Sequence, residues 1–311
     1  MTKAEHWNPS LEKTLDSCSN PVWQELAWAI GSAPMLDPET APFPTLWNED
    51  YHEQALLSFR ALLPHWETIS SAESEVLGAG TLRLGKRFER LINWWFESNP
   101  EWKVLAKNLV IQGNERTLGE MDLIIQNRES SRVLHLEVAC KFYLQIDSSR
   151  DWEHWVGMDP KDRLDLKCRK LKNQLLLDRK PEASALLSEL NIQIDHHAAW
   201  MKGWYFIHFR DAMSARLPHH ANRSASSGWW CRLHEWEDIW TAESKWIIIP
   251  AQHWMRTRHN PPNIMLIAER GIVKDTLQKW KHVMVAQVQM HAGQWRENMR
   301  GIIVRDEWPH V

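Results

Sequence analysis

Residues 134–144 read LHLEVACKFYL, and the alternation in this stretch decides the expected fold. In a β-strand, successive side chains point to opposite faces. One face then carries only apolar side chains and is expected to be core: Leu136, Val138, Cys140, Phe142 and Leu144. The opposite face carries His135, Glu137, Ala139, Lys141 and Tyr143. Because a carboxylate and an ammonium are costly to bury, we expect this second face to meet solvent or to form a site.

Helices and strands alternate around this strand. Further strands are expected at 102–112 (WKVLAKNLVIQ), 120–126 (EMDLIIQ) and 203–209 (GWYFIHF). Apolar residues recur at helical spacing in 81–98 and in 159–180. The order helix, three strands, helix, strand predicts an α/β (α+β) core in which helices flank a central mixed β-sheet.

The chain is expected to contain three regions. Residues 1–80 form an acidic helical N-terminal region, residues 81–210 form the core, and residues 211–311 form a Trp-rich C-terminal extension or subdomain packed on the core. Asn20 and Pro21 are typical of a helix start. A second helix is expected to stop at Pro64, because proline lacks the backbone donor that a helix needs.

A loop rich in Ser, Glu and Gly is expected at 70–80. Beyond the core, strands are expected within 227–236 and 244–250, and a short strand at 301–304. The stretch 275–298 (DTLQKWKHVMVAQVQMHAGQWREN) is expected to form one long helix.

The composition is that of a folded globular protein. Of 311 residues, 43% are hydrophobic and 25% are charged. No run approaches the ~20 apolar residues that span a bilayer, and the first residues lack the apolar segment of a signal peptide. The four cysteines are scattered, which argues against a disulfide framework or a CxxC zinc site. We therefore expect a cytoplasmic protein with no membrane contact.

Charge is distributed unevenly along the chain. Residues 1–80 contain 12 acidic and 3 basic residues, whereas the later part has an excess of bases. The segment 161–180 alone holds 8 bases and 3 acids. A nucleic-acid partner is thus expected to meet the later part of the chain. The 21 tryptophans are expected to be mostly core and interface residues, although indoles also stack on unpaired bases.

Two carboxylates define the candidate site. If the strands at 120–126 and 133–144 pair as neighbours, Asp122 and Glu137 converge on one face. Two carboxylates within ~6 Å repel each other unless a cation lies between them. Oxygen ligands of this kind suit Mg²⁺ or Mn²⁺, and such an ion can activate water and stabilise a phosphodiester transition state.

These residues resemble the core of the PD-(D/E)XK nuclease superfamily. The resemblance rests on GEMDLII, on HLEVACK about fifteen residues later, and on GKRFERL upstream. It implies a restriction-endonuclease-like fold, with Asp122 and Glu137 as catalytic metal ligands and Glu89 completing the metal site. Through DRLDLK, SGWW and RGIIVRDEWP, the chain also resembles a bacterial family of unknown function, number 1853. That family is assigned to the same superfamily.

The lysine departs from the superfamily pattern. The usual lysine follows the glutamate after one residue, a position that Ala139 fills here. Lys141 lies on the same face as Glu137, but the two Cα atoms of an extended strand would be about 13 Å apart. The long lysine stem or a β-bulge would let Lys141 act in catalysis.

The helix at 159–180 offers further positive charge. Its core stripe is expected to be Leu164, Cys168, Leu171 and Leu175. One flank carries Arg163, Lys167, Lys170 and Gln174, which are expected to contact nucleic acid. By resemblance, Lys167 and Gln174 reach the site, while Arg163 and Lys170 meet phosphates.

Each of these residues also has a structural interpretation. Glu137 and Lys141 would form a cross-strand charge pair, Asp122 a turn hydrogen bond, and Glu89 a salt bridge to Lys86. A basic helix is most often a solvated face. The sequence has no P-loop, GxGxxG, GxSxG or HExxH motif, so nucleotide hydrolysis, dinucleotide binding, serine-hydrolase and zinc-protease chemistry are unsupported.

The leading hypothesis is therefore a Mg²⁺- or Mn²⁺-dependent nuclease, with DNA favoured over RNA as its partner. The alternative is a catalytically degenerate relative that binds nucleic acid or a protein partner without cleaving. A third class is a protein-interaction scaffold without nucleic-acid affinity. A protein partner or a homo-oligomer is left open in all three.

Overall fold

A computed structural model describes residues 9–46, 49–69, 83–211, 216–240, 244–255, 268–291 and 293–309. The expected loop at 70–80 lies outside the described residues. The chain divides into two compact units, each discontinuous in sequence. Among described residues, unit 1 contains 141–165 and 203–309, and unit 2 contains 9–140 and 166–202.

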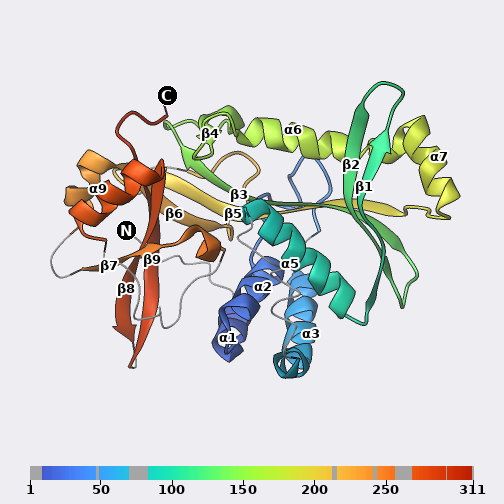
Figure 1. Cartoon of the computed structure of the whole chain (residues 1–311), viewed down its shortest axis with the longest axis horizontal. Helices are drawn as coiled ribbons and strands as arrows, with labels where there is room; N and C mark the ends of the chain where they lie inside the picture. Colours follow the sequence, from blue (N-terminus) through green and yellow to red (C-terminus); the bar gives the residue numbers. More distant parts are fainter. Residues whose placement is uncertain are drawn as a thin grey trace. The chain divides into compact units, whose positions relative to one another are not determined.

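In the described parts of the chain, the strands form a nine-stranded sheet in the order β1-β2-β3-β5-β6-β9-β8-β7, and β4 pairs with β3. Pairs β1–β2, β2–β3, β7–β8 and β8–β9 are antiparallel, whereas β5–β6 and β6–β9 are parallel. The sheet is therefore mixed, and the expected α+β class, with helices flanking a mixed sheet, is confirmed (Figure 1).

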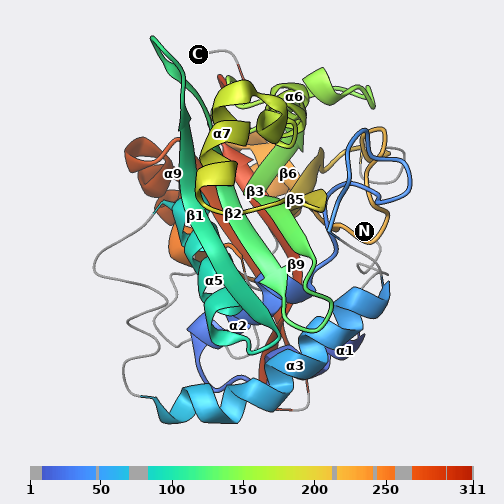
Figure 2. The same ribbon diagram turned by 90° about the vertical axis from the view of Figure 1, so that its right-hand side faces the viewer.

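Unit 2 combines the N-terminal helices with one part of the sheet. Its helices are α1 (Pro9–Ser17), α2 (Pro21–Gly31), α3 (Glu49–Thr68), α5 (Leu84–Ser98), most of α6 (Leu164–Gln174), η2 (Leu177–Arg179) and α7 (Pro181–Glu189). Its strands are β1 (Trp102–Gln112), β2 (Thr117–Asn127) and parts of β3 (Val133–Gln145) and β5 (His196–His208). Within this unit, α2 and α5 lie on one side of the strands, and α6 and α7 lie on the other (Figures 1 and 2).

Helix α2 begins as its sequence predicts. Asn20 is the N-cap, its side chain accepts a hydrogen bond from the Val22 amide (2.9 Å), and Pro21 takes the first helical position. Helix α3, however, does not stop at Pro64 but continues to Thr68. Leu63 and Trp66 are both buried, so packing of the last turn compensates for the missing proline donor.

Helix α6 packs through the stripe expected from its sequence. Leu164, Cys168, Leu171 and Leu175 are all at most 2% exposed. Strand β3 is buried on both faces, so of the two expectations for its second face, contact with solvent is wrong for His135 and Glu137. On the face expected to meet solvent or form a site, His135 and Glu137 are fully buried and Tyr143 is too. Since β3 is buried on both faces in unit 2, a polar residue of this strand needs an internal partner.

Unit 1 contains the C-terminal elements and the remaining parts of β3, α6 and β5. Its other elements are η1 (Trp152–His154), β4 (Trp155–Val156), β6 (Ser226–Arg232), η3 (Leu233–Glu235), α8 (Trp236–Ile239), β7 (Lys245–Ile249), η4 (Ala251–His253), α9 (Arg270–Lys279), β8 (His282–His291) and β9 (Gln294–Val304). The strands expected within 227–236 and 244–250 are present as β6 and β7.

The prediction of one long helix at 275–298 is wrong. Helix α9 ends at Lys279, and the chain then forms the antiparallel hairpin of β8 and β9. Val283 and Val285 alternate on the face of β8 that enters the hydrophobic core of unit 1. Gly293 in the turn has a φ of +80°, a conformation that glycine adopts without strain.

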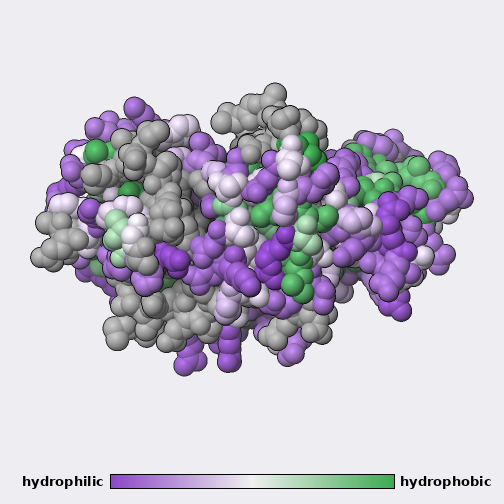
Figure 3. Space-filling view, turned by 90° about the horizontal axis from the view of Figure 1, so that it is seen from below, coloured by the Kyte–Doolittle hydropathy of each residue, from purple (hydrophilic) through white to green (hydrophobic). Residues whose placement is uncertain are grey.

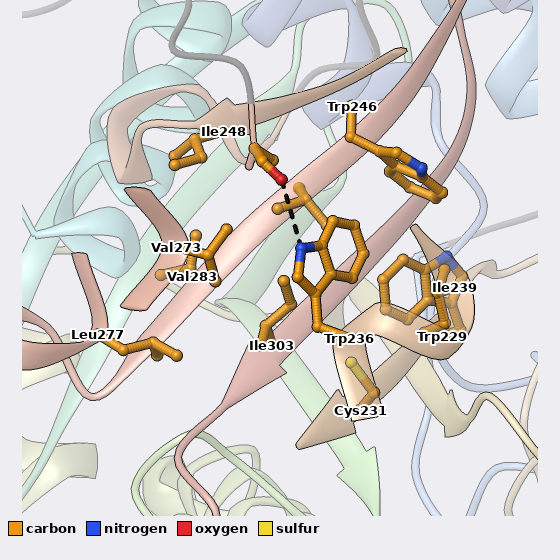
Figure 4. Packing of buried hydrophobic residues seen from close by; sticks show 12 residues of the cluster. Trp229, Cys231, Trp236, Ile239, Trp246, Ile248, Val273, Leu277, Val283 and Ile303 are labelled. Atoms are coloured by element: carbon orange, nitrogen blue, oxygen red, sulfur yellow. Dashed lines mark hydrogen bonds between the residues drawn. The ribbon is translucent and has the colours of Figure 1, made fainter. Parts of the chain in front are cut away.

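Tryptophans fill the core of unit 1. Trp229 stacks on Trp236 with ring centroids 5.9 Å apart, and Trp246 meets both rings edge-on (Figure 4). The Trp236 indole N–H donates to the Ala268 carbonyl at 3.3 Å. Among the tryptophans that the structure describes, fourteen are buried, so the abundance of this residue is mainly a feature of packing.

Exposed apolar side chains form small separate areas on the molecular face in Figure 3, between hydrophilic ones. None of the described helices is long and apolar enough to cross a membrane.

Candidate active site

Asp122 and Glu137 face each other on neighbouring strands of unit 2. The backbone ladder of β2 and β3 runs from Gln126↔Val133 to Leu123↔Leu136. The next residues along the two strands are Asp122 and Glu137. At this point the two strands are connected by hydrogen bonds between side chains and backbone amides. Oδ2 of Asp122 accepts a hydrogen bond from the Val138 amide (2.9 Å), and Oε1 of Glu137 accepts one from the Asp122 amide (3.3 Å).

Burial disfavours the ionised form of both carboxyl groups. It raises the pKa of Asp122 from 3.8 to about 7, and the nearby charge of Glu137 adds to this increase. Burial likewise raises the pKa of Glu137 from 4.5 to about 7, although the hydrogen bond from the Asp122 amide opposes the rise. A pair of neighbouring acids of this kind is stabilised in its ionised form by a cation.

The donor set fits a hard divalent cation. Oε2 of Glu137 is buried and has no hydrogen-bond partner in the part of the chain that the structure describes. Such an oxygen lacks the compensation that buried polar atoms normally have. Mg²⁺ and Mn²⁺ bind through one or two carboxylates and keep several waters, so Asp122 and Glu137 are suitable ligands.

Glu89, the expected third ligand, has another partner. Its carboxylate accepts a hydrogen bond from Nζ of Lys86 at 2.5 Å, one helical turn earlier on α5. Among the described residues, no group of three or more His, Cys, Asp or Glu side chains is arranged to hold an ion. Glu89 nevertheless lines the same pocket as Asp122, and its charge contributes to the raised pKa of Asp122.

Asp122 opens into a pocket of about 640 Å³ within unit 2. One wall of this pocket is α6, which contributes Lys167, Arg169, Lys170 and Gln174. The Lys167 ammonium acts on both carboxyl groups, because its charge opposes the burial-driven rise in their pKa values. The pocket therefore combines the partly buried Asp122, whose neighbour Glu137 lies behind it, with a basic wall, an arrangement suited to an anionic ligand held beside a cation.

Gln174 ties α6 to the edge of the pocket. Its Nε2 donates to the Glu120 carbonyl at 3.2 Å. Its Oε1 is buried and has no hydrogen-bond partner among the residues that are described. Of the four residues expected to contact nucleic acid, Lys167, Lys170 and Gln174 line this pocket.

Lys141 and Arg163 belong to unit 1 and have anionic partners there. Nζ of Lys141 donates to Oδ2 of Asp162 at 2.6 Å. Arg163 precedes α6 and donates two hydrogen bonds to the Asp165 carboxylate, at 2.8 and 2.7 Å. Lys141 was expected to extend toward Glu137, but its ammonium pairs with the Asp162 carboxylate.

His135 is a polar neighbour of Glu137 to which sequence reasoning gave no role. Its Nε2 lies 3.0 Å from Oε1 of Glu137, and its Nδ1 lies 3.2 Å from Nδ1 of His197. The available signal was the period of two along β3, which places His135 and Glu137 on one face. The partner on β5 is not apparent from sequence, because strand neighbours distant in sequence are set by topology.

Comparisons with known proteins identify one family. The family model described as "Domain of unknown function (DUF1853)" matches residues 24–304, most of the chain. No curated protein and no solved structure matches this sequence.

Proposed function

This chain belongs to the DUF1853 family, and we propose that it is a divalent-metal-dependent phosphodiesterase that cleaves nucleic acid, with DNA favoured over RNA. We also propose that its core is of the PD-(D/E)XK type. The observation that carries this proposal is the meeting of Asp122 and Glu137 where backbone pairing of β2 and β3 ends.

Asp122 and Glu137 are the proposed ligands of one Mg²⁺ or Mn²⁺ ion. Their raised pKa values and the unpartnered Oε2 of Glu137 support this role. A bound cation would stabilise the ionised form of both carboxylates and would give Oε2 a partner. When bound, such an ion supplies Lewis-acid stabilisation of the phosphodiester charge. Glu89 is proposed as an assisting group that acts from the other side of the pocket, through its charge.

We assign the lysine function of this site to Lys167. Lys141 is bonded to Asp162 in unit 1, whereas the charge of Lys167 acts on both Asp122 and Glu137. An ammonium beside the reacting phosphate offsets negative charge that develops in the transition state. Lys170 and Arg169 extend the positive wall along α6, where they would hold the backbone phosphates of the substrate.

The test is a cleavage assay on supercoiled plasmid, linear duplex and single-stranded substrates, with Mn²⁺, Mg²⁺ or chelator. The variants are Asp122→Asn and Glu137→Gln, and the matched control is Glu182→Gln, an exposed acid on α7. We expect metal-dependent cleavage by the wild type and the control. In both site variants we expect the cleavage rate to fall at least ~100-fold. Cleavage that persists in Asp122→Asn would contradict the assignment.

A second candidate function is binding without cleavage. It is favoured by Ala139, which occupies the usual lysine position, and by the engagement of Lys141 with Asp162. This candidate predicts salt-sensitive binding of nucleic acid with no product in any metal. A scaffold without nucleic-acid affinity predicts no binding even at low salt.

A further inference from the structure

A chain of polar contacts leads from the buried Glu137 to the surface of unit 2. Oε1 of Glu137 contacts Nε2 of His135 at 3.0 Å, and Nδ1 of His135 contacts Nδ1 of His197 at 3.2 Å. Nε2 of His197 lies 3.3 Å from Oδ2 of Asp178. Four side chains therefore form one continuous path.

Three separate elements supply this path. His135 and Glu137 share a face of β3, and His197 comes from β5, the next strand in the sheet. Asp178 belongs to η2, directly after α6. The side chains of His135 and Glu137 are fully buried, whereas those of His197 and Asp178 are 25% and 24% exposed. The path thus connects the interior of the sheet with its surface.

The contacts fix both imidazole rings. The rings of His135 and His197 are nearly perpendicular, at 87°, with centroids 5.4 Å apart. Because Nδ1 faces Nδ1, one ring donates and the other accepts. If His135 donates to Glu137, His197 donates to His135 from Nδ1, and its contact with Asp178 is a hydrogen bond only when Nε2 of His197 carries a proton as well. A neutral imidazole carries one N–H donor and one acceptor nitrogen, so the two contacts of His135 depend on a single tautomer.

The two oxygens of Glu137 have different surroundings. Oε1 is held by His135 and by the Asp122 amide, whereas buried Oε2 has no partner among the described residues. When Glu137 is ionised, His135 donates to Oε1 from Nε2, which leaves Nδ1 as an acceptor for His197. The histidine and the Asp122 amide then fix the rotation of the carboxylate together.

We propose that His135, held in turn by His197 and Asp178, is a positioning residue that orients the Glu137 carboxylate so that Oε2 is presented to the divalent cation. This inference rests on the cation site of the proposed function. Hydrogen-bonded partners of this kind fix the orientation of metal ligands, and their removal weakens metal binding about 10–100-fold. A network with only a structural role would change stability and leave the cation affinity unchanged.

The test is calorimetric titration of the full chain with Mn²⁺. His135→Leu removes the donor to Glu137, whereas His135→Gln keeps an N–H group near the position of Nε2. The control is His52→Leu, which removes another buried imidazole of the same unit, 2% exposed on α3. We expect His135→Leu to weaken Mn²⁺ binding about tenfold or more, and His135→Gln and the control to stay within about threefold.

Changes at His197 test the next contact of the path. His197→Leu should weaken Mn²⁺ binding less than His135→Leu does. His197→Asn keeps a donor near the position of Nδ1 and should therefore have the Mn²⁺ affinity of the wild type. Equal affinity in the wild type, His135→Leu and His197→Leu would overturn the inference, even if Glu137→Gln abolishes binding and the cation site itself stands.

A spectroscopic readout covers the case in which a leucine variant does not fold. Imidazole ¹⁵N shifts of the wild type should show a single fixed tautomer for His135, and Glu137→Gln should move its Nε2 signal. Asp162→Asn in unit 1 should not. An averaged, unperturbed His135 ring would overturn the inference. Mn²⁺ binding without cleavage would contradict the proposed function alone, whereas no Glu137-dependent Mn²⁺ binding would overturn both proposals.

Discussion

The amide of Val138 donates a hydrogen bond to Oδ2 of Asp122 at 2.9 Å, so a side chain of β2 holds β3 directly beyond the last backbone pair of the two strands. Asp122 therefore has a structural contact in addition to its proposed role as a ligand. An asparagine can still accept this hydrogen bond, whereas an alanine cannot. Asp122→Asn is for that reason the informative variant, and Asp122→Ala is expected to disturb the pairing of β2 with β3 as well.

Glu137→Gln should stabilise the metal-free protein at alkaline pH. In the unfolded chain Glu137 ionises near 4.5, and in the folded chain near 7, so folding retains a proton between these values. The contribution of this protonation to the free energy of unfolding is fully present below pH 4.5 and is lost as the pH rises through 7. We expect the variant to exceed the wild type by about 1–3 kcal/mol at pH 8.5 in urea unfolding, and to match it near pH 4.5.

The control for this experiment is Glu182→Gln, because Glu182 is an exposed acid of the same unit. It should show no gain at pH 8.5. A stability of Glu137→Gln that follows the wild type at every pH would contradict the buried, proton-retaining state of Glu137.

Mn²⁺ should stabilise the wild type and not Glu137→Gln. A ligand that binds only the folded state adds RT ln(1 + [L]/Kd) to stability, about 2.7 kcal/mol at a concentration of 100 Kd. The measurement is thermal unfolding at pH 8 with and without Mn²⁺, with Ca²⁺ as a comparison ion. An equal shift in both proteins would place the bound ion elsewhere.

Lys167 and Lys141 should differ sharply in their effect on cleavage. Lys167→Met is expected to lower kcat/KM at least ~100-fold, because it removes the ammonium that acts on both carboxylates. Lys141→Met should change kcat/KM by less than about threefold and stability by less than ~1 kcal/mol, as its partly exposed pair with Asp162 is a surface interaction. Lys172→Met, on an exposed position of α6, is the control. The opposite order of effects would return the lysine function to Lys141.

Trp236→Ala should destabilise unit 1 by about 3–5 kcal/mol, because it removes a fully buried indole from the centre of the tryptophan cluster. Trp236→Phe keeps an aromatic ring but loses the hydrogen bond to the Ala268 carbonyl, and we expect about half of that loss. Chemical unfolding followed by tryptophan fluorescence measures both. A change below about 1 kcal/mol in Trp236→Ala would show that the cluster contributes little to folding.

Local patterns predicted the elements that carry the candidate site. The alternation of β2 and β3, and the stripe of Leu164 and Cys168 on α6, follow from periods of two and 3.6 residues. The helix expected at 275–298 failed because its Gln, Lys, Ala and Met residues favour helices, whereas pairing of Val283 and Val285 with β9 decides the structure.

Contacts that depend on topology were not accessible from one sequence. The partnership of His135 with His197 requires that β5 lie beside β3, and the burial of both faces of β3 requires helices on both sides of the sheet. The engagement of Lys141 by Asp162 likewise depends on how the loop after β4 folds back. Spacing along β3 predicted which face Lys141 occupies and could not predict its partner.

The most direct test of the shared cation site is a crystal of the full chain soaked in Mn²⁺, with anomalous scattering recorded at the manganese edge. We predict one anomalous peak bound by a carboxylate oxygen of Asp122 and by Oε2 of Glu137, and no such peak in Glu137→Gln crystals. Wild-type crystals at saturating Mn²⁺ with no peak between these two carboxylates would contradict the account.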